Sequence, residues 1–238
     1  MLLEVAGLRK SFGSIVVADD LDLAIAQGEA VGVIGPNGAG KTTLFNLIAG
    51  GLSPNSGTIR FDGRDLAGMP PQARCRAGIG RTHQIPQPFE KLTVFENLLV
   101  GAVHGRRKTE REAAQSCAEI LDRLGLLKRA NTLAGALTLL ERKRLEMARA
   151  LATAPRLLLL DEIAGGLTER ECQDLVATIS EIRSSGVAIL WIEHVVHALL
   201  AVIDRLVVLN FGRKIAEGPP KAVMQLPEVH QIYIGIEA

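Results

Sequence analysis

The feature of this sequence that most constrains its fold is the glycine-rich segment GPNGAGKTT at residues 35–43. It follows the apolar run AVGVI and precedes TTLFNLIAG, in which leucine and isoleucine recur at helical spacing. Glycines in such a loop let the backbone curl so that successive N–H groups converge on one anion, at positions that a β-carbon would block. The segment fits the pattern G-x-x-x-x-G-K-[ST], which predicts a strand, a phosphate-binding loop and a helix in that order.

Lys41 and Thr42 extend this prediction from an anion to a nucleotide with its metal. The helix that begins near Lys41 directs the positive end of its dipole at the bound anion, and the Lys41 ammonium adds a full charge toward the β- and γ-phosphates. The Thr42 hydroxyl can ligate Mg²⁺. A glycine-rich β-turn is the alternative interpretation, but the flanking strand and helix favour a site for a nucleoside triphosphate.

A second candidate part of the site is RLLLLDE at 156–162. Four consecutive leucines are typical of a strand buried on both faces, and Asp161 follows them at the carboxyl end, where ligands bind in open α/β sheets. An aspartate there can hold Mg²⁺ through water, and Glu162 is placed to polarise an attacking water. A leucine run ending in two acids also fits an ordinary strand-to-loop junction, but the phosphate-binding loop upstream favours the catalytic interpretation.

The rest of the chain divides into regions of different periodicity. The first 34 residues predict strands, and TIRFDGRDL predicts a hairpin that turns on Asp62 and Gly63. From about residue 89 the pattern becomes helical, and after Leu151 strands and helices alternate again. One amphipathic helix is predicted to bury Ala114, Cys117, Ile120, Leu121 and Leu124. We predict a single α/β domain over 1–238, with a mostly parallel core sheet, an N-terminal antiparallel β region and an inserted helical subdomain at about 89–153.

Composition narrows the possible functions. No uninterrupted apolar run approaches the roughly 20 residues that a bilayer span needs. Glu4, Arg9 and Lys10 interrupt the N-terminal stretch that would be apolar in a signal peptide, so we expect a soluble, cytoplasmic protein. A net charge of +1 argues against broad electrostatic capture of nucleic acid. The three cysteines form neither a paired motif nor an even framework, and reduced thiols are expected.

Several short stretches together resemble the ATP-binding subunit of an ABC transporter, and the likeness covers nearly the whole chain. They are SFG (11–13), GPNGAGKTT (35–43), RTHQ (81–84), LTVFENLLVGA (92–102), RLEMARAL (144–151), LLLLDE (157–162) and IEH (192–194). RLEMARAL paired with LNFGRKIAEG (209–218), and the tail VHQIYIG (229–235), look most like the branched-chain amino acid importers. The resemblance implies a P-loop NTPase fold of the ABC ATPase type, ATP and Mg²⁺ as cofactors, and ATP hydrolysis coupled to transport.

The resemblance also implies roles for single residues. Phe12 takes the place of an aromatic that stacks on adenine. Gln84 matches a glutamine that contacts Mg²⁺ and the attacking water, and His194 matches a histidine that contacts the γ-phosphate and Glu162. Glu193 and His197 receive no role and are expected at the surface. The predicted catalytic residues are Glu162, His194 and Gln84, the predicted metal ligands are Thr42, Gln84 and Asp161, and the predicted nucleotide contacts are Phe12, Gly35, Pro36, Asn37, Gly38, Ala39, Gly40, Lys41, Thr42 and Thr43.

Partners follow from the same resemblance. In such transporters each ATP is held by the phosphate loop of one chain and capped by a signature stretch of a second chain. We therefore expect a second ATP-binding subunit, identical or different, and transmembrane permease subunits that hold the chain at the inner face of the cell membrane. An extracytoplasmic solute-binding protein would act indirectly, and no nucleic acid partner is expected. Closure of the ATP-bound pair would be the catalytic event that is transmitted to the permease.

The signature stretch, residues 137–141, departs from the family pattern. Leu-Ser-Gly-Gly-Gln aligns with LTLLE, so Thr138 keeps the hydroxyl while Leu140 takes the place of the second glycine. A leucine there should obstruct close backbone approach to phosphate. Two hypotheses follow. Either the loop shifts slightly and the site still closes, or a pair formed with a different ATP-binding chain would have one competent and one impaired site.

Three further residues, Ile163, Thr168 and Val195, also differ from the family pattern. Thr168 falls in the segment that communicates between the two sites.

Three rival functions are alternatives to a transporter subunit. A non-transport ABC protein of DNA repair or translation would usually carry two cassettes, coiled coils or zinc insertions, which this sequence does not show. A phosphotransferase would have no use for the three predicted catalytic residues. A binding module without turnover is the third rival, because of Leu140.

Overall fold

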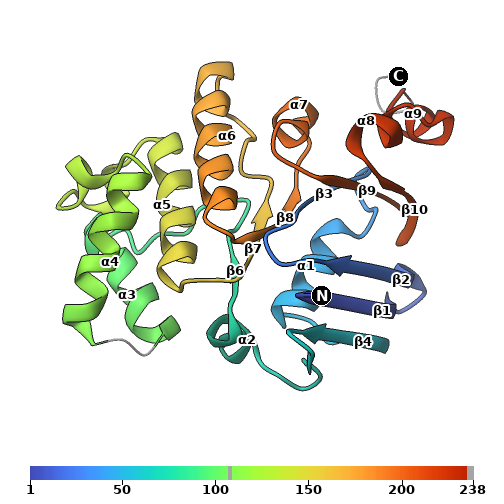
Figure 1. Ribbon diagram of the computed structural model, residues 1–238, viewed down its shortest axis with the longest axis horizontal. Coiled ribbons are helices and arrows are strands. Elements are labelled where there is room, and N and C mark those ends of the chain that lie inside the picture. The colour runs from blue at the N-terminus through green and yellow to red at the C-terminus, as the bar shows by residue number, and fades with distance from the viewer. Residues whose placement is uncertain (107–108, 235–238) are drawn as a thin grey trace.

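The structure, a computed structural model, describes residues 1–106 and 109–234. Within these ranges the larger of two sheets has six strands in the order β10-β9-β3-β8-β7-β6, all parallel except β10 (Figure 1). The strand bounds are β3 Ala30–Ile34, β6 Ile79–Arg81, β7 Leu157–Asp161, β8 Ala188–Ile192, β9 Arg205–Asn210 and β10 Arg213–Gly218. The tail at 229–235, used for the resemblance, ends outside the described residues.

The smaller sheet is antiparallel, in the order β2-β1-β4-β5, and lies at the lower right of Figure 1. Its bounds are β1 Leu3–Phe12, β2 Ile15–Ile25, β4 Ser56–Phe61 and β5 Arg64–Asp65. Helix α1 (Lys41–Ala49) shares one hydrophobic core with this sheet and with one face of the larger sheet, so it is enclosed between the two. The predicted hairpin turn is confirmed, since Asp62 and Gly63 join β4 to β5 with φ angles of 53° and 73°.

Strand β7 explains why the core strands are apolar throughout. Leu157 and Leu159 belong to the core around α1, whereas Leu158 and Leu160 belong to a second core on the opposite face. Both faces of the sheet are therefore covered, as is usual for parallel strands. The predicted buried strand is confirmed, and it places Asp161 at the carboxyl edge of the sheet.

The helices of the second core include a group that lies apart from the antiparallel sheet. Helices α3, α4 and α5 follow one another in the chain between β6 and β7 and pack together at the left of Figure 1. The remaining helices cover the sheet or close the chain. Helix and short 3-10 helix bounds are α2 Pro71–Ala77, α3 Val94–Arg106, α4 Glu110–Arg123, η1 Leu127–Arg129, η2 Ala134–Ala136, α5 Leu139–Ala152, α6 Glu169–Ser184, α7 Val196–Leu200, α8 Pro220–Met224 and α9 Pro227–Ile234.

The predicted amphipathic helix corresponds to α4, but its buried face is displaced by one residue at its start. Ala113 is fully buried, whereas Ala114 and Ile120 are only half-buried. Cys117, Leu121 and Leu124 are buried as predicted. The expected fold class is confirmed: a mostly parallel core sheet, an N-terminal antiparallel β region and a group of helices inserted between β6 and β7.

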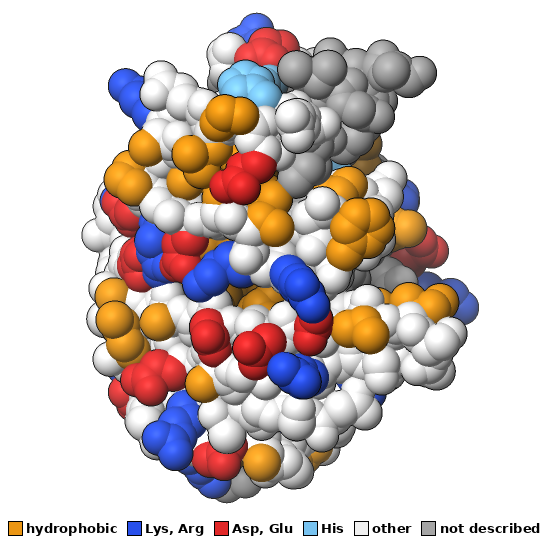
Figure 2. Space-filling view, turned by 90° about the vertical axis from the view of Figure 1, so that its right-hand side faces the viewer, with side chains coloured by type: hydrophobic (Ala, Val, Ile, Leu, Met, Phe, Trp, Pro, Cys, Tyr) orange, Lys and Arg blue, Asp and Glu red, His pale blue; other side chains and the backbone are white. Residues whose placement is uncertain are grey.

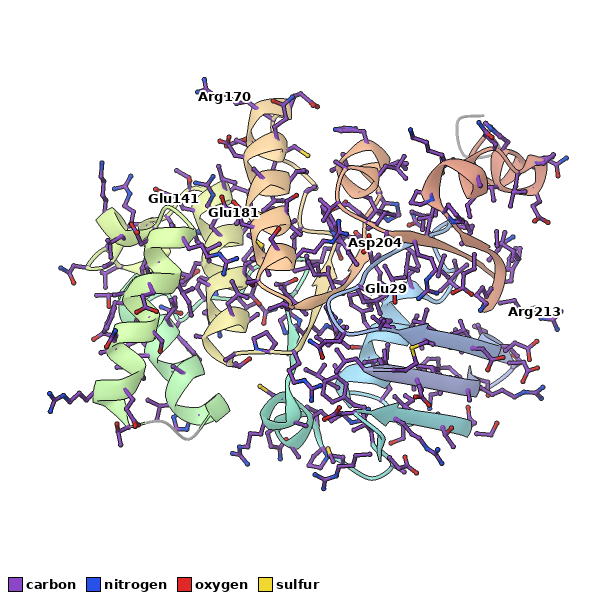
Figure 3. All side chains as sticks on the ribbon, viewed as in Figure 1. Glu29, Glu141, Arg170, Glu181, Asp204 and Arg213 are labelled. Atoms are coloured by element: carbon purple, nitrogen blue, oxygen red, sulfur yellow. The ribbon has the colours of Figure 1, made fainter. Side chains whose placement is uncertain are left out.

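Charges of both signs lie next to one another on the side of the molecule drawn in Figure 2. Arg213, labelled at the right-hand edge of Figure 3, pairs with Asp19 at 2.6 Å.

Across the described ranges, no helix is both long enough and apolar enough to cross a bilayer.

Candidate functional site

The glycine-rich loop runs from the end of β3 to the start of α1, as predicted. Gly40 precedes the helix with a φ of 98°, and a β-carbon there would lie 2.2 Å from the carbonyl oxygen of Val17. A β-carbon on Gly35 would lie 2.1 Å from the carbonyl oxygen of Leu209. These two positions require glycine because the backbone of β2 and of β9 passes directly against the loop. Gly38, with a φ of 79°, would meet nothing within 4 Å.

A pocket of about 230 Å³ opens over this loop. It is lined by Val17, Asn37, Gly38, Ala39, Gly40, Lys41, Thr42, Thr43 and Glu162. Loop residues and one predicted catalytic residue therefore face a common space. The Lys41 ammonium donates to the carbonyl oxygens of Gly35 and Pro36 at 2.7 and 3.0 Å, which fixes the side chain along the loop.

Val17 and Phe12 belong to the antiparallel sheet, and only Val17 is shown against the loop. Val17 lines the pocket, whereas Phe12 lies at the end of β1 with 49% of its surface exposed and does not line it. The Lys10 ammonium lies 5.2 Å from the centroid of the Phe12 ring. The predicted stacking of Phe12 on adenine stays a prediction.

The three predicted catalytic side chains meet at one carboxylate. Glu162 Oε1 lies 2.9 Å from His194 Nε2, and Glu162 Oε2 accepts a hydrogen bond from Gln84 Nε2. The three residues follow β7, β8 and β6, whose carboxyl ends lie side by side at one edge of the sheet. The structure thus brings together residues that are far apart in the sequence, and their catalytic roles stay predictions.

Asp161 is 3% exposed and engages a residue that sequence reasoning missed. Arg81 Nη2 donates to its carboxylate at 3.0 Å, and Arg81 Nη1 donates to Asn46 Oδ1 at 2.6 Å. Burial raises the pKa of Asp161, and the Arg81 guanidinium partly offsets that rise. Arg81 is the first residue of the RTHQ stretch, and its place at the end of β6 was the signal that could have identified it.

The charges of the Glu162 and Asp161 carboxylates also act on the Lys41 ammonium. Burial lowers the pKa of Lys41, while Glu162 and Asp161 act in the opposite direction. Lys41 and Glu162 line the same pocket, and the binding roles of Lys41 and Asp161 stay predictions.

The signature stretch forms the start of α5, where Glu141 is labelled in Figure 3. The Thr138 side chain accepts from the Glu141 N–H at 3.3 Å, and the Glu141 carboxylate accepts from the Thr138 N–H at 2.9 Å. This reciprocal capping box satisfies two N–H groups at the helix start. Leu139 is 47% exposed, whereas Leu140 is half-buried, so the neighbouring leucine is the more exposed of the two.

Thr168, another departure from the family pattern, caps helix α6. Its side chain accepts from the Glu171 N–H, and the Glu171 carboxylate accepts from the Thr168 N–H at 2.9 Å. A hydroxyl at this position therefore performs a defined structural role at the end of the loop that follows Glu162.

The prediction that Glu193 lies at the surface was wrong. Glu193 is 1% exposed, and its carboxylate accepts main-chain N–H groups. Lys143, one of four consecutive charged residues at 141–144, is also buried, at 4% exposure. His197 is exposed as predicted, with its imidazole 3.4 Å from Glu169.

Fold and site together define a nucleotide-binding protein of the phosphate-loop class. A family model described as ABC transporter matches residues 18–165. The high-affinity branched-chain amino acid transport ATP-binding protein BraF of Pseudomonas aeruginosa is 38% identical over 98% of each chain. Its counterpart LivG of Escherichia coli is 39% identical, again over 98% of each chain. The solved ADP conformation of an ATP-binding cassette of an ABC transporter is 33% identical over 98% of each chain, with a TM-score of 0.90. The chain belongs to the ABC transporter family, in agreement with the resemblance found in its sequence.

Proposed function

We propose that this chain binds ATP with Mg²⁺ at the phosphate loop and hydrolyses it to drive import of a small solute through a membrane permease. The observation that carries the proposal is the position of Glu162, which lines the pocket over the loop while His194 and Gln84 hold both of its carboxylate oxygens. A carboxylate held in this way is placed to orient and polarise a water beside the γ-phosphate. The backbone of residues 35–43 and Lys41 would hold the phosphates, and Phe12 would stack on the adenine.

Mg²⁺ fits the donors present at this edge of the sheet. Thr42 lines the pocket with an exposed side chain, and Glu162, which follows Asp161 and contacts Gln84, also lines it. Thr42, Asp161 and Gln84 all carry oxygen atoms, the ligand type that Mg²⁺ prefers. Bound there, the ion would neutralise charge on the β- and γ-phosphates. Asp161 currently pairs with Arg81, so we propose that it exchanges part of this contact when it takes up its metal-binding role.

Branched-chain amino acids are the first candidates for the transported solute. This assignment rests on BraF and LivG, whose names describe branched-chain amino acid transport and whose sequences align with this chain over nearly its full length. We propose the same arrangement of partners: a second ATP-binding subunit, permease subunits that hold the chain at the inner face of the membrane, and, indirectly, an extracytoplasmic solute-binding protein. In this arrangement the chain is one ATP-binding domain with its helical insert at about 89–153.

A composite site with little turnover, the alternative that Leu140 raises, is not favoured by the relatives, which are named as transport ATP-binding proteins. It rests on the leucines at the start of α5 alone, where exposed Leu139 and half-buried Leu140 take the places of the two glycines. Pairing with a different ATP-binding chain would then leave the site formed by this chain's phosphate loop competent and the other impaired.

The proposal is tested with the chain expressed together with candidate permease and solute-binding proteins from its own genome. Proteoliposomes containing the complex should take up radiolabelled leucine, isoleucine or valine in an ATP-dependent manner. Uptake that is independent of ATP, or a purified chain without Mg²⁺-dependent ATP binding, would refute the proposed function. Transport of a different solute would refute only the substrate assignment.

A further inference from the structure

Two buried charges lie between α5 and the loops that carry Glu162 and His194, and neither belongs to the proposed nucleotide contacts. Burial lowers the pKa of Lys143, and the nearby carboxylates of Glu193 and Glu162 act against that change. Burial raises the pKa of Glu193, and its main-chain N–H donors and Lys143 act against that rise. The hydrogen bonds recorded for the two side chains go to main-chain groups of the two loops.

Lys143 fixes the main chain directly after Glu162. Its ammonium donates to the carbonyl oxygen of Ile163 at 2.7 Å, across from α5 to the loop after β7. Because Lys143 belongs to the second turn of α5, this hydrogen bond joins the signature helix to the peptide unit next to the proposed catalytic carboxylate.

Glu193 holds the main chain of two loops, the one after β7 and the one after β8. One carboxylate oxygen accepts the Ala164 N–H at 2.6 Å, in the loop after Glu162. The other accepts the N–H groups of His194 at 2.9 Å and Val195 at 3.3 Å, in the loop after β8. A single side chain therefore joins the main chain of the two loops whose side chains meet in the Glu162–His194 contact.

The backbone at Glu162 needs such support. Its φ angle is 46°, in the left-handed region that is unfavourable for a residue with a β-carbon. Conformations of this kind persist where the surrounding structure over-determines them. Here the Glu162 N–H donates to the Ile192 carbonyl oxygen at 2.9 Å on one side, while Lys143 and Glu193 hold the next two residues on the other.

We propose that Lys143 and Glu193 are a pair of positioning residues that hold the Glu162 carboxylate against His194, and that Lys143 makes this geometry depend on the position of α5. The catalytic importance of this Glu162–His194 geometry rests on the proposed hydrolytic function. Because the first turn of α5 would face the nucleotide of the partner subunit, the pair connects that second site to the hydrolytic carboxylate of this chain.

The test uses the full chain with Lys143→Met, Glu193→Gln and the conservative Lys143→Arg. Two controls carry charges that bond main-chain groups away from Glu162 and His194. Arg74→Met removes a cation of 5% exposure that also donates to carbonyl oxygens. Asp204→Asn removes a more exposed carboxylate, labelled in Figure 3, that pairs with Arg183 and accepts the Ala30 N–H at the amino end of β3. Fluorescence of Trp191, the single tryptophan, reports the unfolding midpoint of each variant.

Two measurements decide the proposal. Hydrogen exchange at 161–168 and 192–197 should accelerate by about tenfold or more in Lys143→Met and Glu193→Gln, with the controls unchanged at these segments. The kcat for ATP should fall by about tenfold or more, while the Kd for MgATP changes by less than about threefold. Lys143→Arg should recover part of the kcat, because it keeps the charge and the donor.

Three outcomes would overturn the proposal: unchanged exchange and kcat in Lys143→Met, an equal loss of kcat in Arg74→Met of matched stability, or a rise in Kd with kcat retained. If Lys143→Met fails to fold, Glu193→Gln and Lys143→Arg decide by the same criteria. A wild-type chain that binds MgATP but releases no phosphate would contradict the hydrolytic function instead. The exchange data would still show whether the pair holds the two loops.

Discussion

His194 Nε2 lies 2.9 Å from Glu162 Oε1, and the two side chains come from the ends of adjacent parallel strands. Gln84 contacts the second oxygen of the same carboxylate from the end of β6. Residues from the loops after β8 and β6 therefore contact the carboxylate of Glu162 in the loop after β7. These two contacts set the orientation of the carboxylate.

Glu162→Gln should abolish most turnover while nucleotide binding is retained. The amide keeps the size of the side chain but loses the negative charge that would polarise water, and general-base contributions are typically worth about 10²- to 10⁴-fold in rate. Phosphate release and equilibrium binding of a fluorescent ATP analogue measure the two properties separately. Turnover at the wild-type rate would remove Glu162 from the proposed catalytic role.

Gly40→Ala should prevent nucleotide binding and lower the unfolding midpoint, because the new β-carbon would lie 2.2 Å from the Val17 carbonyl oxygen. Gly38→Ala is the matched comparison, since it carries a similar positive φ but has open space around the added carbon. In stability, Gly38→Ala should show only the backbone strain, about 1–2 kcal/mol. Trp191 fluorescence during thermal unfolding compares the two variants, and an equal loss of stability would contradict the steric argument.

Leu140→Gly tests the hypothesis of unequal composite sites. If the leucine impairs the site that caps the partner's nucleotide, glycine should raise ATP turnover at that site in the assembled transporter. Leu139→Gly provides the comparison, because Leu139 is the more exposed of the pair. Turnover is measured per site, with the partner's own catalytic acid substituted in turn. An absence of gain in Leu140→Gly would favour the simpler alternative, in which the loop shifts and the site closes.

The capping box of α5 should make stability depend on acidic pH. Burial alone would raise the pKa of Glu141, but hydrogen bonds from Thr138 and Arg129 outweigh it, and the pKa lies below its ordinary value of 4.5. A carboxyl whose pKa is depressed by folding contributes stability that is present above the unfolded pKa and is lost as pH falls through the folded pKa. Glu141→Gln should therefore lose stability at neutral pH and show a shallower decline below about pH 4.5 than wild type. Chemical denaturation across this pH range measures it, and parallel declines would contradict the assignment.

Much of the fold follows from local patterns in the sequence, whereas two residues near the site do not. The leucine strand and the glycine loop are short, strongly patterned segments. The strand before the loop, the helix after it and the buried leucine strand were therefore all predicted correctly. Glu193 and Lys143 carry charges that ordinarily mark a surface, and nothing local reveals that their partners are main-chain groups from distant loops. The shift from Ala114 to Ala113 has a simpler cause, since α4 begins at the Thr109 cap and adjacent alanines fit either edge of its apolar face.

Gly40 approaches the backbone of Val17 in β2, and Gly35 approaches the backbone of Leu209 in β9. The glycine loop is therefore enclosed by one strand that is synthesised before it and by another that is synthesised after it. Its close contacts are complete only once β9 has joined the sheet. A fragment that lacks either strand would keep every residue of the phosphate-binding motif and lose one of the two backbones against which the loop packs.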